Sequence, residues 1–258
     1  IALAVSQSTA DFVIHARRIP AARVKVVYLG VPLEEFSRPR PADEVRAARH
    51  ELGIQDGEFA IGCVTRLHPS KGNSYLVEAA AQVVRDRPHA RFFLVGEGPL
   101  QPELEAQAAG LGLGDRFVFA GFQRDVARTV SAFDLSVFPS LWEGTPLTVF
   151  ETLAMGKPIV ATDADGLLDV LVDRQTALIV AKRDASALAG ALIFAMDRDE
   201  VRHALSEAAR AAGREYDIAV FVRKMERLYV LLHETSRVTK RRGVLAADLS
   251  FLLARTRA

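Results

Sequence analysis

Short apolar runs alternate with longer amphipathic stretches along most of the chain. Six largely apolar runs predict buried strands, at 59–64, 91–95, 117–120, 135–138, 158–162 and 177–180. The stretches between and after them predict helices, at 74–85, 100–111 and 126–133 and after Thr148, Ala185, Val201 and Ile218. In the first stretch, Leu76, Ala79 and Val83 have the spacing of one helix face. Because strands without polar alternation, separated by helices, are typical of a parallel sheet covered on both faces, we expect a doubly wound, Rossmann-like α/β domain over residues 55–215.

The first part of the chain has a different pattern. Residues 2–5 and 24–29 are strand-like and residues 9–18 are helix-like, which gives too few strands to bury a sheet. The chain also begins within the first of these strands and without a methionine. We therefore expect residues 1–36 to be the truncated tail of a preceding α/β domain.

The regions that flank the expected sheet are a linker and a C-terminal extension. Prolines at positions 32, 39 and 41 favour a linker, so residues 37–54 are interpreted as a linker and a first helix. Residues 216–258 are expected to form C-terminal helices. Their last part, 240–258, begins with three basic residues followed by an amphipathic pattern, which suits an anionic membrane surface. The alternative is that this tail packs across the missing domain or frays.

The charge, the hydrophobic content and the cysteine count of the chain exclude several classes of protein. The 258 residues carry 33 Lys and Arg against 32 Asp and Glu, and half of them are hydrophobic. These values exclude a disordered chain, and the net charge of +1 gives no general field for nucleic acid. Cys63 is the only cysteine, which excludes an internal disulfide and a thiolate zinc cluster and favours a reducing, cytoplasmic compartment. No apolar run approaches the roughly 20 residues that span a bilayer.

The segment from Ser140 to Glu151 carries the first candidate site. Thr145 is a suitable N-cap and Pro146 suits the first helical position, so a helix should start just after the strand that ends at Phe138. Its free amides and its dipole would face the carboxyl edge of the sheet and attract an anion. Two carboxylates, Glu143 and Glu151, could reach the same crevice. The alternative is a capped helix with two solvated glutamates.

A second candidate cluster lies in the segment 66–72, which follows the first strand of the expected sheet. It brings Arg66 and Lys71 to the same carboxyl edge, where ligands of open α/β sheets bind. A planar guanidinium together with a mobile ammonium suits a diphosphate. Two such features on one edge favour a phosphorylated ligand over two solvated loops.

Further short motifs accompany these clusters in a fixed order along the chain. They are Arg66-Leu67, Lys71-Gly72, Val95-Gly96-Glu97-Gly98-Pro99, Gly121-Phe122, Phe138-Pro139-Ser140 and Glu143-Gly144-Thr145-Pro146-Leu147. With this set, the chain resembles the C-terminal, donor-binding half of a GT-B glycosyltransferase of family 4, the glycosyl transferases of group 1. The glutamates at 143 and 151 match the E-x7-E motif of that family, and the resemblance runs from about residue 2 to about residue 233.

The resemblance implies roles for four residues in catalysis. Arg66 and Lys71 would hold the diphosphate of a nucleotide sugar, Glu143 would lie beside the donor sugar, and Glu151 would accept hydrogen bonds from the ribose hydroxyls. Cleavage of the anomeric bond builds negative charge on the leaving diphosphate, which fixed cations and helix amides stabilise without reorganising.

The resemblance also implies residues that bind the donor without reacting. Amides around Gly144, Thr145, Pro146 and Leu147 would meet phosphate or sugar oxygens. Phe122 would flank the base, and the turn at Gly96 would line the cleft. Asp163-Ala164-Asp165 is a D-x-D pattern, but a metal would be redundant beside the basic pair, so neither a metal nor another cofactor is expected.

The resemblance further implies the reaction and its partners. A nucleotide diphosphate sugar would donate, with retention of anomeric configuration, to a hydroxyl of a sugar, lipid-linked or small-molecule acceptor. The enzyme would be cytoplasmic and could lie peripherally on the inner face of the membrane. Because the acceptor-binding half of the family's fold is not in the sequence, we expect weak donor binding and little turnover from this chain. A sugar-nucleotide epimerase of the same fold and a non-catalytic nucleotide-binding module are the alternatives.

Overall fold

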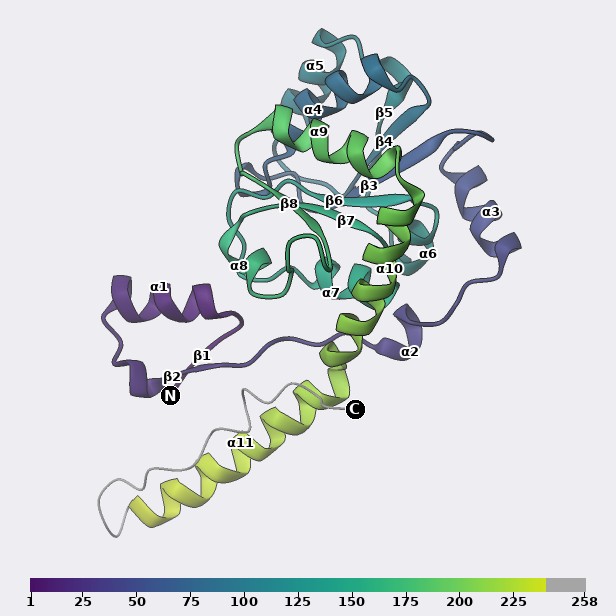
Figure 1. Cartoon of the computed structure of the whole chain (residues 1–258). Coiled ribbons are helices and arrows are strands. Elements are labelled where there is room, and N and C mark those ends of the chain that lie inside the picture. The colour runs from purple at the N-terminus through teal and green to yellow at the C-terminus, as the bar shows by residue number, and fades with distance from the viewer. Residues whose placement is uncertain (240–258) are drawn as a thin grey trace.

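A parallel sheet forms the centre of the molecule, as the computed structural model, which describes residues 1–239, shows (Figure 1). Within this part of the chain the sheet has six strands: β3 (Phe59–Val64), β4 (Ala90–Val95), β5 (Phe117–Gly121), β6 (Leu135–Phe138), β7 (Ile159–Thr162) and β8 (Leu178–Val180). Their order is β5-β4-β3-β6-β7-β8, and every neighbouring pair is parallel. The chain therefore winds outward from β3 in one direction and from β6 in the other, which confirms the predicted doubly wound sheet.

Burial explains why the strands show no polar alternation. Every residue of β6 and β7 is buried, whereas the edge strands β5 and β8 are mostly half-buried. Helices cover both faces, so central strands have no side that faces water. The sequence pattern and the layered structure thus have the same cause.

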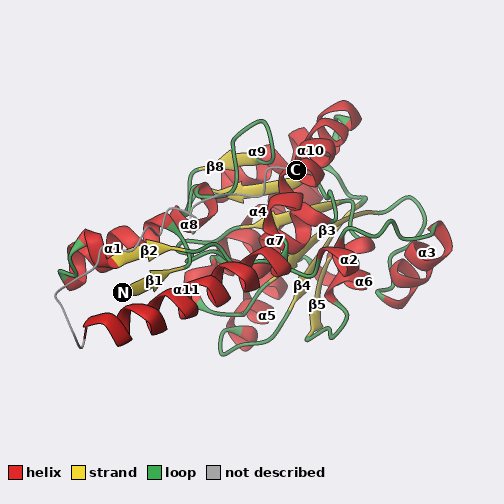
Figure 2. Ribbon diagram, turned by 90° about the horizontal axis from the view of Figure 1, so that it is seen from below, coloured by secondary structure: helices red, strands yellow, loops and turns green. Residues whose placement is uncertain are grey.

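Two sets of helices longer than one turn cover the two faces of the sheet (Figures 1 and 2). The first set is α4 (Asn73–Asp86), α5 (Gln101–Gly110) and α9 (Ala185–Met196). The second set is α3 (Ala42–Glu51), α6 (Val126–Ser131), α7 (Leu147–Ala154) and α10 (Asp199–Gly213). The helices predicted from amphipathic spacing are all present, and their ends differ from the predicted ones by a few residues.

Two helices of a single turn were not predicted. They are α2 (Leu33–Phe36) and α8 (Asp165–Leu168). Pro32 directly precedes α2 and Pro41 directly precedes α3, so these prolines begin helices as well as interrupting the chain. Their fixed φ suits a helix start, and Phe36 of α2 is buried beside the sheet.

The N-terminal segment forms a small unit beside the sheet domain (Figure 1). In it, β1 (Ala2–Ala4) and β2 (Val24–Val26) pair in parallel and are connected by α1 (Gln7–Arg17). The long helix α11 (Ile218–Thr239) packs on this unit through Leu228, which meets Val27 (Figure 2). Short 3-10 turns complete the described elements at Ala21–Arg23, Pro69–Lys71, Gly114–Arg116 and Arg214–Tyr216.

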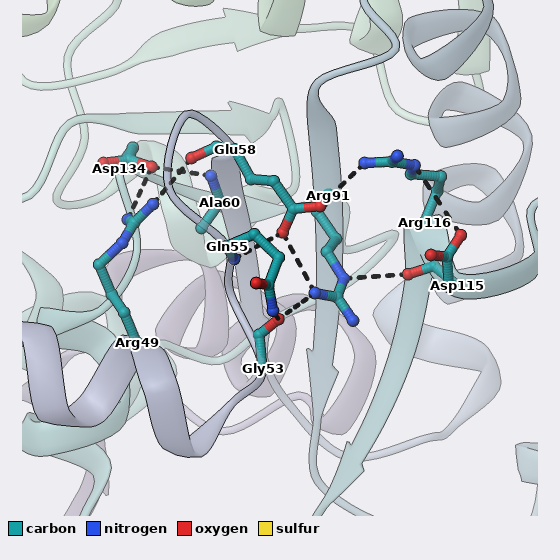
Figure 3. Close-up of polar contacts among 9 residues, drawn as sticks. All are labelled: Arg49, Gly53, Gln55, Glu58, Ala60, Arg91, Asp115, Arg116 and Asp134. Carbon is teal, nitrogen blue, oxygen red and sulfur yellow. Dashed lines mark hydrogen bonds and ion pairs between the residues drawn. The ribbon is translucent and has the colours of Figure 1, made fainter.

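A polar network fixes the amino edge of the sheet, opposite the predicted site (Figure 3). Asp134 accepts the Ala60 amide at 2.7 Å and pairs with Arg49 of α3 at 3.0 Å. Glu58 pairs with Arg91 at 3.1 Å and with Arg116 at 2.9 Å. Burial disfavours the charged form of Glu58, but the Gln55 amide and the two arginines outweigh it, so its pKa lies below the ordinary value.

The predicted membrane contact cannot be placed on these elements. None of the helices among residues 1–239 has the length and apolar character needed to cross a bilayer. The basic, amphipathic segment 240–258 lies outside the described residues.

Candidate functional site

A cleft of about 390 Å³ opens at the carboxyl edge of the sheet. It lies where β3 separates β4 from β6, the point at which the winding direction changes. Residues that follow β3, β4 and β5 and the start of α7 form its walls. Among the predicted site residues, the cleft is lined by Arg66, Lys71, Gly96, Phe122, Pro146 and Leu147.

The loop after β3 has a fixed shape. Asn73 donates from its side chain to the Arg66 carbonyl at 3.1 Å, and the His68 ring accepts the Ser70 amide at 3.3 Å. The Arg66 side chain is exposed and has no hydrogen bond or ion pair to any residue of the described chain. The backbone of Arg66 is therefore held while its guanidinium stays free for a ligand.

The second predicted cation, Lys71, is already paired. Its ammonium lies 2.6 Å and 2.7 Å from the two carboxylate oxygens of Glu143. Ser140 donates to the same carboxylate at 2.7 Å. The Glu143 side chain is 6% exposed and that of Lys71 is 18% exposed, so removing either partner would leave a charge that is largely buried and unpaired.

Glu151 lies on α7 outside the walls of the cleft. Burial raises its pKa to about 7, with a smaller contribution from the carboxylate of Glu35 on α2. Its Oε2 atom is buried and has no hydrogen-bond partner among the described residues. A buried acceptor without a donor is unusual, and it suits a ligand that brings hydroxyl groups.

The start of α7 differs from the sequence prediction. Thr145 does not cap the helix, because its hydroxyl donates to the Gly144 carbonyl at 2.6 Å and to the Gly166 carbonyl at 3.4 Å. Pro146 takes the N-cap position and the helix begins at Leu147. The reason is the close approach of α8, since a Cβ atom added to Gly166 would lie 2.0 Å from the Gly144 oxygen.

The predicted anion-binding amides are nevertheless available at this helix start. The amides of Gly144, Leu147 and Thr148 make no hydrogen bond to the backbone or side chains of the described residues. Pro146 has no amide hydrogen, so it can offer only its ring. Free amides at a helix N-terminus, together with the dipole of α7, favour an anion in the cleft.

Two glycines at the site, Gly96 and Gly144, differ in how closely their surroundings pack. Gly96 has φ +130°, and a Cβ atom there would lie 1.9 Å from the Thr65 oxygen, so close packing of two loops requires it. At Gly144 an added Cβ would meet only the side chains of Val5 and Thr9, at 3.5 Å and 3.7 Å. Packing therefore explains the glycine at 96 and not the one at 144.

The remaining predicted residues lie at the lip of the cleft or outside it. Phe122 is 68% exposed and lies at the lip. In the D-x-D pattern, Asp163 accepts the Lys182 amide at 2.7 Å and Asp165 lies 3.6 Å from the Lys182 ammonium. No group of three potential metal ligands forms within residues 1–239.

A larger cleft lies elsewhere. Its volume is about 520 Å³, and β8, α9 and α10 line it with mainly apolar residues. None of the predicted site residues borders it.

Sequence reasoning missed three residues that shape the site. They are Ser140, which was noted only as part of a motif, Glu35 and Thr162. Ser140 and Glu35 act on the two glutamates, and Thr162 donates to the Ser140 carbonyl. Only Ser140, adjacent to the glutamate motif, offered any signal in the sequence.

The comparisons with known proteins identify a family. The family model for glycosyl transferases group 1 matches residues 44–212. An alpha-D-kanosaminyltransferase of Streptomyces kanamyceticus is 30% identical over 78% of this chain and 53% of its own length. A lipopolysaccharide core biosynthesis mannosyltransferase of Rhizobium meliloti is 30% identical over 76% of this chain and 56% of its own length. The chain thus spans about half the length of these curated relatives.

Solved structures show the same fold. HepE of Anabaena, crystallised in complex with UDP and glucose, superposes with a TM-score of 0.82 at 25% identity. The match covers 88% of this chain and 62% of the HepE chain. The fold is therefore shared with a protein whose crystal structure contains UDP and glucose.

Proposed function

The chain belongs to the glycosyl transferases of group 1, and from that premise we propose that its cleft binds a nucleotide diphosphate sugar. The whole protein transfers the sugar to an acceptor hydroxyl, on a sugar, a lipid-linked glycan or a small molecule, with retention of configuration. The observation that carries this proposal is that the unpaired side chain of Arg66 and the free amides at the start of α7 line one cleft at the switch point of the sheet.

The chemistry follows from where charge develops. When the anomeric bond breaks, the leaving diphosphate gains negative charge. The amides at the start of α7 are held in place before the reaction, so they stabilise that charge without reorganising, and the free Arg66 guanidinium adds a charged hydrogen bond to the phosphate. Lys71 can donate one N–H to a phosphate oxygen while it stays paired with Glu143, whose carboxylate would lie beside the sugar. With these cations in place, transfer needs no metal.

Two other predicted residues define the nucleoside end. Glu151 has an unpartnered buried oxygen that ribose hydroxyls would satisfy, and Phe122 offers an exposed ring to the base. The complexes of HepE with UDP and with UDP-glucose support a nucleotide-sugar donor of this kind.

Calorimetric titration with UDP, GDP and ADP tests the proposal. Arg66→Ala is the most informative variant, because Arg66 is exposed and holds no other described residue. We expect one nucleotide to bind and Arg66→Ala to weaken it about tenfold, which is the loss of one charge-assisted hydrogen bond to phosphate. Lys71→Ala is a poorer choice because it also strands the buried Glu143 carboxylate.

The matched control is Arg46→Ala, an exposed arginine on α3 at the other edge of the sheet. It should leave both affinity and the unfolding midpoint unchanged. If the unaltered chain binds none of the three nucleotides, or if Arg66→Ala binds as tightly as Arg46→Ala, the proposal is wrong.

A further inference from the structure

Ser140 lies where the loop after β3, which carries Lys71, meets the loop after β6, which carries Glu143. It is 3% exposed, and its hydroxyl donates to Glu143 Oε1 at 2.7 Å. The same oxygen accepts from Lys71 at 2.6 Å. One carboxylate oxygen therefore accepts a hydrogen bond from each loop. Lys71 donates from the loop after β3, and Ser140 donates from the loop after β6.

The backbone around Ser140 is fixed from two sides. Thr162 at the end of β7 donates its hydroxyl to the Ser140 carbonyl. The Ser70 carbonyl accepts the amides of Leu141 and Trp142 at 2.8 Å and 3.2 Å. The position of the Ser140 hydroxyl is thus set by strands and loops before any ligand arrives.

We propose that Ser140 is a positioning residue that holds the Glu143 carboxylate so that the Lys71 ammonium stays at the mouth of the diphosphate site. Lys71 has four rotatable side-chain bonds and Glu143 has three, whereas Ser140 has one and is buried. The short side chain therefore restrains the two long ones, and it lowers the entropy cost of ordering them when a ligand binds. This role rests on the proposed function, because the ligand is the donor diphosphate.

The test compares Ser140→Ala with Ser136→Ala. Ser136 is also 3% exposed and lies in β6, but its hydroxyl has no partner among the described residues. We expect Ser140→Ala to weaken binding of the preferred nucleoside diphosphate about tenfold, and Ser136→Ala to leave it unchanged. Ser140→Thr, which keeps the hydroxyl, should restore most of the affinity.

A second measurement does not depend on nucleotide binding. The rate at which an amine-reactive acylating reagent labels Lys71, read by mass spectrometry, reports how often its ammonium leaves Glu143. We expect Ser140→Ala to raise that rate severalfold and Ser136→Ala to leave it unchanged. Lys157 serves as the internal reference, because it donates to the Ser131 and Phe133 carbonyls and has no contact with Ser140.

A double mutant shows whether Ser140 acts through Glu143. In a Glu143→Gln background, Ser140→Ala should change Lys71 labelling little, because the carboxylate it positions is gone. An unchanged labelling rate in Ser140→Ala overturns the positioning role even if nucleotides bind. If labelling changes as expected but the unaltered chain binds no nucleotide, the proposed function fails, and only the restraint of Lys71 by Ser140 through Glu143 stands.

Discussion

Glu151 shows how burial can set the charge of a single residue. Its carboxyl group is partly buried in α7, one oxygen has no hydrogen-bond partner in the described chain, and the second carboxylate nearby is Glu35. Both burial and the like charge favour the protonated form, which places the pKa at about 7 instead of 4.5. A change of pH near neutrality therefore alters the charge of the site.

This shift predicts a pH-dependent stability that Glu151→Gln should remove. Between pH 4.5 and 7 the folded chain keeps a proton on Glu151 that the unfolded chain has released. The contribution of protonated Glu151 to the stability of the fold is therefore complete below pH 4.5 and is lost as the pH rises through 7. As the pH rises over that range, we expect the free energy of unfolding of Glu151→Gln to increase by about 1–2 kcal/mol relative to that of the unaltered chain. This figure allows for the partial exposure of the side chain.

Urea unfolding at several pH values measures this difference. Glu103→Gln on α5 is the control, since Glu103 is exposed and has no partner among the described residues. The interpretation is wrong if the stability difference between the unaltered chain and Glu151→Gln is the same at pH 5 and pH 8.

At this scale the sequence indicated which residues belong to the site, but it did not indicate which of them are paired with one another. The spacing of Glu143 and Glu151 and the basic pair Arg66 and Lys71 stood out from the sequence. That Lys71 pairs with Glu143 while Arg66 stays free depends on how two loops, 72 positions apart in sequence, meet. The N-cap expected at Thr145 failed for the same reason, because a carbonyl of α8 takes its hydroxyl.

At the scale of elements, the loop after β3 and the loop after β6 are pressed together. Gly72, at the C-terminal end of the 3-10 turn Pro69–Lys71, has φ +64°. A Cβ atom there would lie 2.0 Å from the Pro139 carbonyl oxygen. The turn that presents Lys71 thus depends on a residue without a side chain.

Gly72→Ala should therefore lose more folding free energy than the positive φ angle alone would cost. Gly57 provides the matched control, because it has φ +83° and an added Cβ would meet nothing within 4 Å. We expect Gly57→Ala to cost about 1 kcal/mol of folding free energy, from the left-handed conformation alone. Gly72→Ala should cost at least about 2–3 kcal/mol, because the backbone must also move. Chemical unfolding measures both, and equal costs would contradict the close contact.

Elements were predicted where the sequence carries a periodic signal. The alternation of apolar runs and amphipathic stretches indicated strands β3 to β8 and the long helices. The helices α2 and α8 have four residues each, fewer than the pattern needs to show a period. The network of Asp134, Arg49 and Glu58 joins distant segments and has no local signature (Figure 3).

At the scale of the whole molecule, the N-terminal unit meets the sheet domain beside the site. Asp169, which follows α8, accepts the amides of Gln7 and Ser8 at 2.6 Å and 3.3 Å. A carboxylate at the first turn of α1 satisfies free amides and complements the helix dipole. Val5 and Thr9 of the same unit are the nearest neighbours of a side chain added at Gly144.

Asp169→Ala should loosen this contact without unfolding the sheet. Losing a charged cap costs about 1–2 kcal/mol, so amide hydrogen exchange in α1 should become about tenfold faster, while exchange in β6 and β7 stays unchanged. Asp165→Ala is the control, because Asp165 lies on α8 and its side chain has, among residues 1–239, only an ion pair with Lys182 at 3.6 Å. If Asp169→Ala accelerates exchange equally in α1 and in the central strands, the carboxylate stabilises the whole fold and does not act as a local joint. If exchange in α1 is unchanged, other contacts hold the unit beside the cleft, and the two amide hydrogen bonds contribute little.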